Sequence, residues 1–415
     1  MQKNENSYNL SKGQACTSGA RGKWALTVIV LLAAIGFTPQ AEAQSNLLKI
    51  SGFSEVRFNS SFGTPADPEA AERFELSGGE EHMIEKGNNI SFSGINLNLQ
   101  SELNAKLHFQ SELYLAYEHD ELELHLLRAY ADYRISEKFN LQAGKFLAPI
   151  GYLNRNQRIY SYLNYSVKPR DMVNEEMGFI PLFVIGLQAY GSLPLGNSNI
   201  NYRVAYGTNR SQAPHGGSIA TAHIGEEEET SPGWSGLIEY LAAAGNGDIT
   251  VGLSGYSNGS IKTIYVVEGD SVASGDLQLR ETGIAPYVRL DQPRFQLMAE
   301  YHAVTFEDLS GVTGANKHDY KAASVELVYK TSILNRPLYP YVRYDYRKVS
   351  SNHPFYGLLM EHDEIQKTYP FNNSEIMAGF CWDILESSRL KVEYGTFTTG
   401  PMPGNRITVS TSFAF

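Results

Sequence analysis

The chain has 415 residues and a formal net charge of −11, with 34 Lys and Arg against 45 Asp and Glu. This acidic balance argues against a nucleic-acid partner, because proteins that bind nucleic acids carry basic patches or stripes. Tyrosine (26) and glycine (37) are abundant, and no apolar run after residue 43 is long enough for a transmembrane helix.

A secretory signal peptide is predicted for residues 1–43. Four basic residues precede the apolar run WALTVIVLLAAIGF (24–37), and Ala41-Glu42-Ala43 follows as a small-x-small cleavage site. The alternative is a membrane anchor, but this run is shorter than the about 20 residues that a helical span needs. Cleavage after Ala43 removes Cys16 and leaves only Cys381, so no intrachain disulfide is expected. An exported chain of this composition is either a soluble β protein or a transmembrane β-barrel.

From residue 44 onward, a period-2 alternation of side chains predicts strands. In LYPYVRYDYRK (338–348), Val342 and Tyr344 alternate with Arg343 and Asp345, so one face is apolar and the other charged. In LLRAYADYRI (126–135), Leu127 is assigned to the apolar, outward face. Sixteen such segments are predicted, at 47–61, 89–101, 104–118, 121–136, 139–147, 181–192, 198–208, 233–243, 247–258, 278–291, 293–305, 318–332, 337–348, 373–385, 388–398 and 404–415.

The connections between these segments alternate in length. Those after even-numbered strands are short turns such as SEKF, LPLGNS and AAGNG, whereas most of those after odd-numbered strands are longer. A β-sandwich or a solenoid shows no such alternation, but outer-membrane β-barrels have short periplasmic turns and longer extracellular loops. The predicted fold is therefore an all-β transmembrane antiparallel β-barrel of sixteen strands over residues 44–415, with both termini in the periplasm.

Outward aromatic residues are predicted near the strand ends, as in the two interfacial girdles of such barrels. They are Tyr117, Tyr206, Tyr344 and Tyr346 on the extracellular side, and Tyr329, Phe413 and Phe415 on the periplasmic side.

The long third extracellular loop, 148–181, is predicted to fold into the lumen and narrow it. It is about 34 residues long without regular structure, and loops of that length are usually functional. Fixed charges and tyrosines in a narrowed pore set its selectivity; a surface loop on the rim is the alternative. The candidate constriction residues are Arg155, Arg158, Tyr160, Tyr162, Lys168, Arg170, Asp171, Glu175 and Glu176.

The chain resembles bacterial outer-membrane porins in four features taken together: the signal peptide, the number of strands, the long third loop and the terminal Phe. The stretch YADYRISEKFNLQAGKFLAPIGYLN (130–154) is similar to the region before the constriction in the phosphate-selective porins O and P. This resemblance implies a homotrimer of barrels in the outer membrane of a Gram-negative bacterium, in contact with lipid and lipopolysaccharide. The anion-selective members of that family line the pore with an arginine ladder.

The inward faces carry charges of both signs, which departs from a basic ladder. Mixed charge across a pore favours a transverse field and modest selectivity. The predicted pore-lining residues are Arg57, Arg128, Asp132, Arg134, Arg203, Glu239, Arg289, Glu300, Arg343, Asp345 and Arg347, with Glu55, Glu112 and Glu326 on the same faces.

Other chemistry is weakly indicated. GYSNG (255–259) resembles part of the outer-membrane phospholipase A segment, but Gly255 replaces its His, so Ser257 has no adjacent base. The acidic loop HIGEEEET (223–230) offers carboxylates to a divalent cation, although a solvated loop is the simpler interpretation. We expect no metal site, no cofactor and no enzymatic activity.

A passive porin for small hydrophilic solutes is the favoured function. The alternatives are a substrate-specific channel, for anions or phosphate, and a structural or adhesion barrel. The final segment, ITVSTSFAF (407–415), is interpreted as the closing strand. Its Phe413 and Phe415 resemble the signal that the outer-membrane barrel assembly machinery reads.

Overall fold

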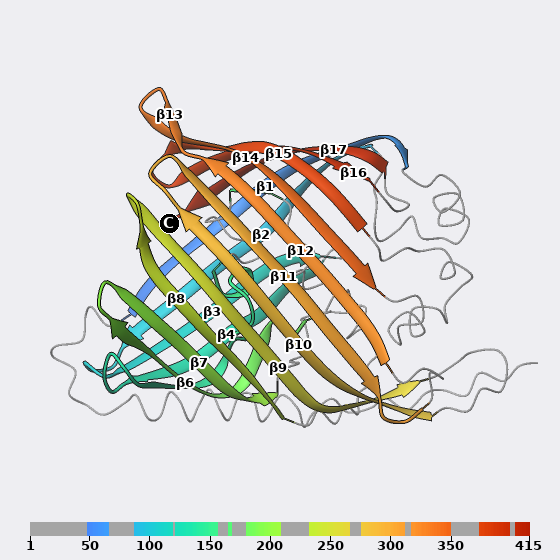
Figure 1. Ribbon diagram of the computed structural model, residues 1–415. Helices are drawn as coiled ribbons and strands as arrows, with labels where there is room; N and C mark the ends of the chain where they lie inside the picture. The colour runs from blue at the N-terminus through green and yellow to red at the C-terminus, as the bar shows by residue number, and fades with distance from the viewer. Residues whose placement is uncertain are drawn as a thin grey trace, which may run out of the picture. The chain divides into compact units, whose positions relative to one another are not determined.

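The chain folds into a single antiparallel sheet that closes on itself (Figure 1). The computed structural model describes residues 48–65, 87–118, 121–156, 165–167, 180–208, 232–265, 275–311, 317–349, 373–398 and 403–415, all within the unit Leu48–Phe415. The predicted signal peptide lies outside the described residues. Among these ranges, no helix is long and apolar enough to cross a membrane.

The first half of the wall consists of β1 (Leu48–Pro65), β2 (Gly87–Glu102), β3 (Leu107–Glu118), β4 (Glu121–Arg134), β5 (Asn140–Leu147), β6 (Phe183–Leu195), β7 (Ser198–Thr208) and β8 (Gly233–Ala244). The second half consists of β9 (Gly247–Tyr265), β10 (Gly275–Asp291), β11 (Phe295–Asp308), β12 (Lys317–Tyr329), β13 (Thr331–Ile333), β14 (Arg336–Val349), β15 (Asn373–Leu385), β16 (Ser388–Phe397) and β17 (Pro403–Ala414). A one-turn helix, α4 (Leu153–Asn156), follows β5.

Closure comes from the pairing of β1 with both β2 and β17. Because β13 continues β12 past Lys330 and both pair with β14, the seventeen strand segments make sixteen wall strands. The predicted fold class, a closed sixteen-stranded antiparallel barrel, is confirmed. At the seam, Gly52 and Phe415 exchange two backbone hydrogen bonds, of 2.8 and 2.9 Å.

The two faces of the wall differ as the alternation predicts. On β12, Val325 and Leu327 are 41% and 44% exposed, whereas Glu326 between them is 1% exposed. Alternate side chains of a strand point to opposite faces, so one wall surface is apolar and the other polar. Large apolar side chains on the outer surface include Ile90, Leu124, Leu187, Ile238 and Leu253.

Five of the predicted girdle residues are exposed on this outer surface. Tyr206 and Tyr344 are exposed toward the long-loop end, and Tyr329, Phe413 and Phe415 toward the short-turn end. The side chain of Tyr117 is outside the described part. The turn at Leu334 and Asn335 has φ of 52° and 60°, the backbone of a two-residue hairpin turn that matches strand twist.

Two expectations about strands were wrong. Strands β9 and β10 pair as far as Tyr265 and Gly275, so they extend beyond the predicted limits of 258 and 278. Leu127 is only 2% exposed, because the pairing shifts between Glu112 and Leu113 of β3. This bulge adds one residue to β4, which reverses the side-chain alternation on its N-terminal side.

Deleting Phe415 should lower the amount of assembled barrel, because it removes the last backbone pair of the closing seam. The measurement is the fraction of heat-modifiable, folded protein after equal export. Phe415→Ala keeps the backbone pair but loses the ring, so it separates closure from recognition of the aromatic group. Equal assembly of the deletion variant and the parent would contradict the closing role.

Candidate pore lining and the segment after β5

The residues predicted to line the lumen lie mostly on the buried face of the wall. Nearly inaccessible to solvent there are Glu55, Glu112, Asp132, Glu239, Glu300, Glu326, Arg343, Asp345 and Arg347. Arg57, Arg128, Arg203 and Arg289 are half-buried on the same face. Arg134 differs, because its side chain is 57% exposed at the end of β4, where its Nε lies 3.0 Å from Asp132.

Many charges on this face occur in pairs of opposite sign. Arg128 Nε lies 2.5 Å from Glu112, and an Arg57 nitrogen lies 3.1 Å from Glu55. Arg289 pairs with Asp291, which also binds Lys330. Removing a charge from water costs several kcal/mol unless a partner compensates it, so buried charges require such pairing.

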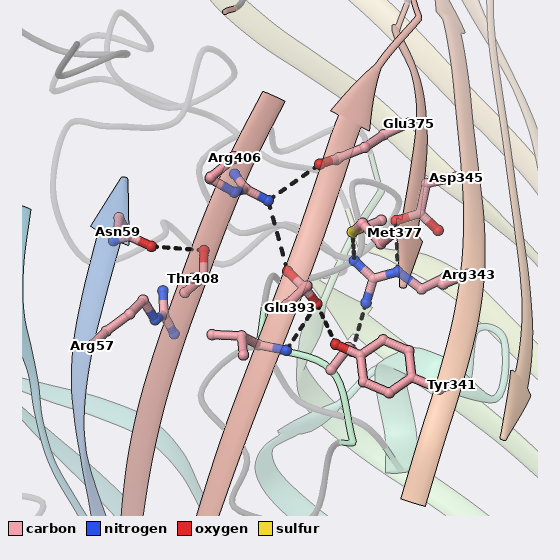
Figure 2. A network of polar contacts seen from close by, with 12 residues as sticks. Arg57, Asn59, Tyr341, Arg343, Asp345, Glu375, Met377, Glu393, Arg406 and Thr408 are labelled. Atoms are coloured by element: carbon pink, nitrogen blue, oxygen red, sulfur yellow. Dashed lines mark hydrogen bonds and ion pairs between the residues drawn. The ribbon is translucent and has the colours of Figure 1, made fainter. Parts of the chain in front are cut away.

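Arg343 is the centre of one network, on β14 (Figure 2). Its Nε lies 3.2 Å from Asp345, and its two terminal nitrogens donate to Ser166 Oγ at 2.5 Å and to Met377 Sδ at 2.9 Å. Figure 2 shows the guanidinium enclosed by residues of β14 and β15. A cation in this position is fully desolvated, so it holds the surrounding groups in place.

Glu393 on β16 is the second centre (Figure 2). It accepts hydrogen bonds from Tyr341 Oη at 2.7 Å and from the backbone of Val167 at 3.1 Å, and lies 3.8 Å from Arg406. Arg406 also binds Glu375 at 3.2 Å. Residues 165–167 of the third loop are therefore bonded to the buried face of β14 and β16.

Tyr165 adds an aromatic contact to this attachment. Its ring lies 4.8 Å from that of Tyr339, centroid to centroid. Burial raises the pKa of the Tyr165 phenol to about 12, so the group stays uncharged well above neutral pH.

The first part of the third loop, 148–156, is anchored near β6. The backbone N–H of Ala148 donates to the carbonyl of Leu182 at 2.9 Å. The side-chain amide of Asn154 donates to the carbonyl of Ala148 and to that of Leu182. The expectation that this loop has no regular structure was wrong, because α4 forms one helical turn here. Sequence alone does not predict so short a helix, since an isolated turn is unstable without tertiary contacts.

Glu300 of β11 binds the start of α4. One of its oxygens accepts the backbone N–H groups of Tyr152 at 2.7 Å and Leu153 at 3.0 Å, as a capping carboxylate does. Its other oxygen lies 2.5 Å from His302 Nε2. Gly151 suits this position because its φ of +64° is strained for other residues, and a Cβ there would displace the Glu300 carboxylate, 2.1 Å away.

Arg155 of α4 forms an ion pair and a hydrogen bond with strands β8 and β10 of the wall. Its guanidinium lies 2.5 Å from Glu239 on β8 and donates to Tyr287 Oη on β10 at 3.1 Å. Tyr287 donates in turn to Glu239. Of the predicted constriction residues, Arg155 is the one that the described ranges include; Arg158, Tyr160, Tyr162, Lys168, Arg170, Asp171, Glu175 and Glu176 lie outside them.

An apolar cluster beneath the segment was not predicted. Ile150 and Leu153 pack with Leu237, Met298 and Phe306, which lie on the same strand faces as Glu239 and Glu300. Sequence reasoning treated those faces as wet throughout. The alternation of side chains along a strand could have revealed the cluster, because residues two apart share a face. Leu237 is two residues from Glu239, and Met298 is two residues from Glu300.

The remaining candidates are not associated with the networks above. Ser257 is exposed on the outer face of β9, and Cys381 is buried on β15 without a disulfide. The acidic loop 223–230 is outside the described residues.

No family model and no curated protein matches this chain. Solved structures match over most of it. The outer membrane channel DcaP of Acinetobacter baumannii has a TM-score of 0.54 at 13% identity, covering 89% of this chain and 97% of its own. OprB of Pseudomonas putida has a TM-score of 0.55 at 9% identity, covering 95% and 97%. Salmonella typhi OmpF, in complex with daunomycin, has 0.51 at 14%, covering 89% and 97%.

The fold is thus that of outer-membrane porins and channels. Together with the apolar outer wall, it makes this chain a β-barrel of the Gram-negative outer membrane.

Replacing Glu300 by Ala should lower the free energy of unfolding by about 2 kcal/mol, because the buried N–H of Leu153 and the partly buried N–H of Tyr152 lose a charged acceptor. Denaturant titration in detergent measures the loss, and hydrogen exchange should accelerate at Tyr152 and Leu153. Glu307→Ala is the control on the same strand, since its exposed pair with Arg280 is worth less than about 1 kcal/mol. Unchanged exchange at 152–153 in Glu300→Ala would show that the capping contact does not hold α4.

Proposed function

We propose that this protein is a porin: a water-filled channel for passive diffusion of small hydrophilic solutes or ions, with no catalytic role. The observation that carries the proposal is the contrast between the two wall surfaces. Charged side chains such as Glu112, Arg128 and Asp345 occupy one surface, and large apolar side chains occupy the other. A sheet with an apolar outside and a charged inside suits a channel across lipid.

The proposed constriction is loop 148–181. Its described parts support this role, because 148–156 bonds to β8, β9, β10 and β11 while 165–167 bonds to β14 and β16. Strands so far apart around a closed sheet are reached most directly across its interior. A loop on that path reduces the pore width, and its fixed charges act on the passing solute.

Charge pairing favours modest selectivity. Guanidinium groups such as those of Arg57, Arg128 and Arg155 each have a carboxylate within 3.1 Å. Paired charges present a dipole rather than a net charge to a solute, so weak discrimination between anions and cations is expected.

A substrate-specific anion channel, like the phosphate-selective porins O and P, is the second candidate. The observation that favours it is Arg203 on β7, which makes no ion pair with any described carboxylate and instead lies 5.1 Å from the ring centroid of Tyr190. An unpaired guanidinium on the inner wall attracts anions. A third candidate, a structural or adhesion barrel, has no such observation in its favour.

Partners follow from the same proposal. We infer a homotrimer, contact with outer-membrane lipid and lipopolysaccharide, assembly by the outer-membrane barrel machinery, and small hydrophilic solutes as cargo.

Planar-bilayer recording of the purified barrel tests the channel. Stepwise openings that persist in symmetrical salt are expected, with a conductance that rises with salt concentration. Absence of any opening from folded protein would leave the structural barrel as the better proposal. A saturating, anion-limited conductance would favour the second candidate.

Reversal potentials in a KCl gradient test the constriction. Arg155→Gln leaves the Glu239 carboxylate unpaired and should shift the preference toward K⁺. Glu239→Gln leaves Arg155 unpaired and should shift it toward Cl⁻, while the double variant returns close to the parent. Arg134→Gln, at the exposed end of β4, is the control. Unchanged potentials in both single variants, and in Arg155→Gln combined with Arg158→Gln, would place the loop at the rim.

A further inference from the structure

Water reaches the inner wall unevenly. On β12, the inward side chains from His318 to Val328 are at most 2% exposed, and residues 165–167 of the third loop bond to β14 and β16. On the other part of the wall, several inward side chains are only half-buried. Four of them, in the short-turn half of the barrel, form a group that we call the amide–tyrosine strip: Asn98 of β2, Gln110 of β3, Tyr130 of β4 and Tyr190 of β6. The strip is therefore a place where a solute in the proposed channel meets the wall.

The strip is uncharged and rich in hydrogen-bonding groups. Gln110 Nε2 donates to Asn98 Oδ1 at 3.0 Å, and Tyr130 Oη donates to Gln110 Oε1 at 2.5 Å. Among the described residues, these bonds leave both N–H groups of Asn98 and one of Gln110 unused. On β5 and β6, Gln188 donates to Gln142 at 2.5 Å, which adds another pair of amides to this part of the wall. Each amide offers both donors and an acceptor, so the strip can hydrogen-bond a solute in either direction.

Most of the charges beside the strip cancel in pairs. Arg128 Nε lies 2.5 Å from Glu112, and Arg134 Nε lies 3.0 Å from Asp132. Arg203 on β7 makes no ion pair with any described carboxylate, so one guanidinium remains at the edge of the strip. An ion in front of the strip therefore meets amide and phenol dipoles and a single uncompensated charge. A neutral solute with many hydrogen-bonding groups meets a surface that matches it along its whole width.

We propose that the amide–tyrosine strip binds a saccharide that passes through the channel, an inference that rests on the proposed function. A sugar hydroxyl donates and accepts hydrogen bonds at once, as the amides of Asn98 and Gln110 do. Tyr130 and Tyr190 add an apolar ring with a polar tip, which suits the C–H face of a sugar ring. Neighbouring strands are about 4.8 Å apart, so the strip is about 19 Å wide from β2 to β6 and exceeds the width of one sugar ring.

The pattern of donors and acceptors decides against simpler occupants. A small inorganic anion uses Arg203 and gains nothing from the amide oxygens. A polyether accepts hydrogen bonds but donates none, so it cannot use the second lone pair of the Asn98 and Gln110 oxygens. A site that hydrogen-bonds hydroxyl groups discriminates against an analogue that lacks them. Binding should therefore require several hydroxyl groups on one molecule and no net charge.

The test is saturation-transfer-difference NMR of galactose with the purified, folded barrel in an amine-oxide detergent, which contains neither sugar nor polyether groups. Saturable binding to the parent is expected. Asn98→Leu with Gln110→Leu should raise the dissociation constant about tenfold, because two hydrogen-bonding groups are lost. Galacturonate, the same ring with a carboxylate, should bind within about fivefold of galactose, since one half-exposed charge contributes little more. Tetraglyme, an ether of similar size, should not compete.

Tyr190→Leu is a second variant that leaves both amides in place, and loss of the ring should raise the dissociation constant about fivefold. The matched control is Asn59→Leu, which removes an inner-wall amide of β1 toward the long loops, where it accepts from Thr408 at 2.9 Å. It should change binding less than about twofold, since no strip hydrogen bond is lost.

Absence of saturable binding to the parent, or unchanged dissociation constants in both strip variants, would overturn the site. An equal loss in Asn59→Leu would overturn its location. Much tighter binding of galacturonate would make it an anion site, and equal competition by tetraglyme would show that hydroxyl groups are not recognised; either result would overturn the assignment to saccharides. Heat-modifiability of each variant shows that it is folded.

Conductance separates this proposal from the channel itself. Galactose near its dissociation constant should reduce the single-channel ion current of the parent, and the same concentration should reduce that of Asn98→Leu/Gln110→Leu much less. A barrel that binds galactose through the strip but never opens would contradict the porin and leave the binding site standing. A barrel that opens but binds no galactose would leave the porin standing and overturn the saccharide site.

Discussion

Closure of the sheet is the constraint on which the rest of this structure depends. Inside a bilayer no water satisfies the backbone, so each N–H and C=O must find a partner within the protein. The pairing of β1 with β17, ending in the bonds between Gly52 and Phe415, supplies the partners that an open sheet would lack. Once the sheet is closed, every side chain has one of two surroundings, lipid outside or the interior.

This division explains how charges are distributed along the strands. Several buried ion pairs join residues two apart in one strand, because that spacing puts both side chains on one face. Arg57 pairs with Glu55 and Arg343 with Asp345, and His302 contacts Glu300 in the same way. This spacing alone does not identify the inner wall, because Lys317, Asp319 and Lys321 of β12 have the same spacing on the exposed face. Such pairing lowers the cost of burial without help from another strand.

The sequence predicted what depends on neighbours along the chain. Sixteen strands and their two faces follow from a period of two, which is a local property. Leu127 was misplaced because its bulge depends on how β4 pairs with β3. Helix α4 was missed because its capping group, Glu300, lies far along the chain and has no sequence link to Tyr152. The apolar contacts of Met298 and Phe306 were missed for the same reason, since the segment that covers them arrives from β5.

The wall and the third loop also satisfy each other's buried polar groups. Glu300 and Glu393 are buried carboxylates whose oxygens accept backbone N–H groups from Tyr152, Leu153 and Val167. Without the loop these acceptors would remain desolvated with fewer partners, and without the carboxylates the loop would keep unpaired N–H groups. These two carboxylates hold the loop in position, and this role does not depend on a solute. The electric field inside the barrel therefore depends on charges that do not anchor the loop, such as Arg203, which makes no hydrogen bond or ion pair with residues 148–156 or 165–167.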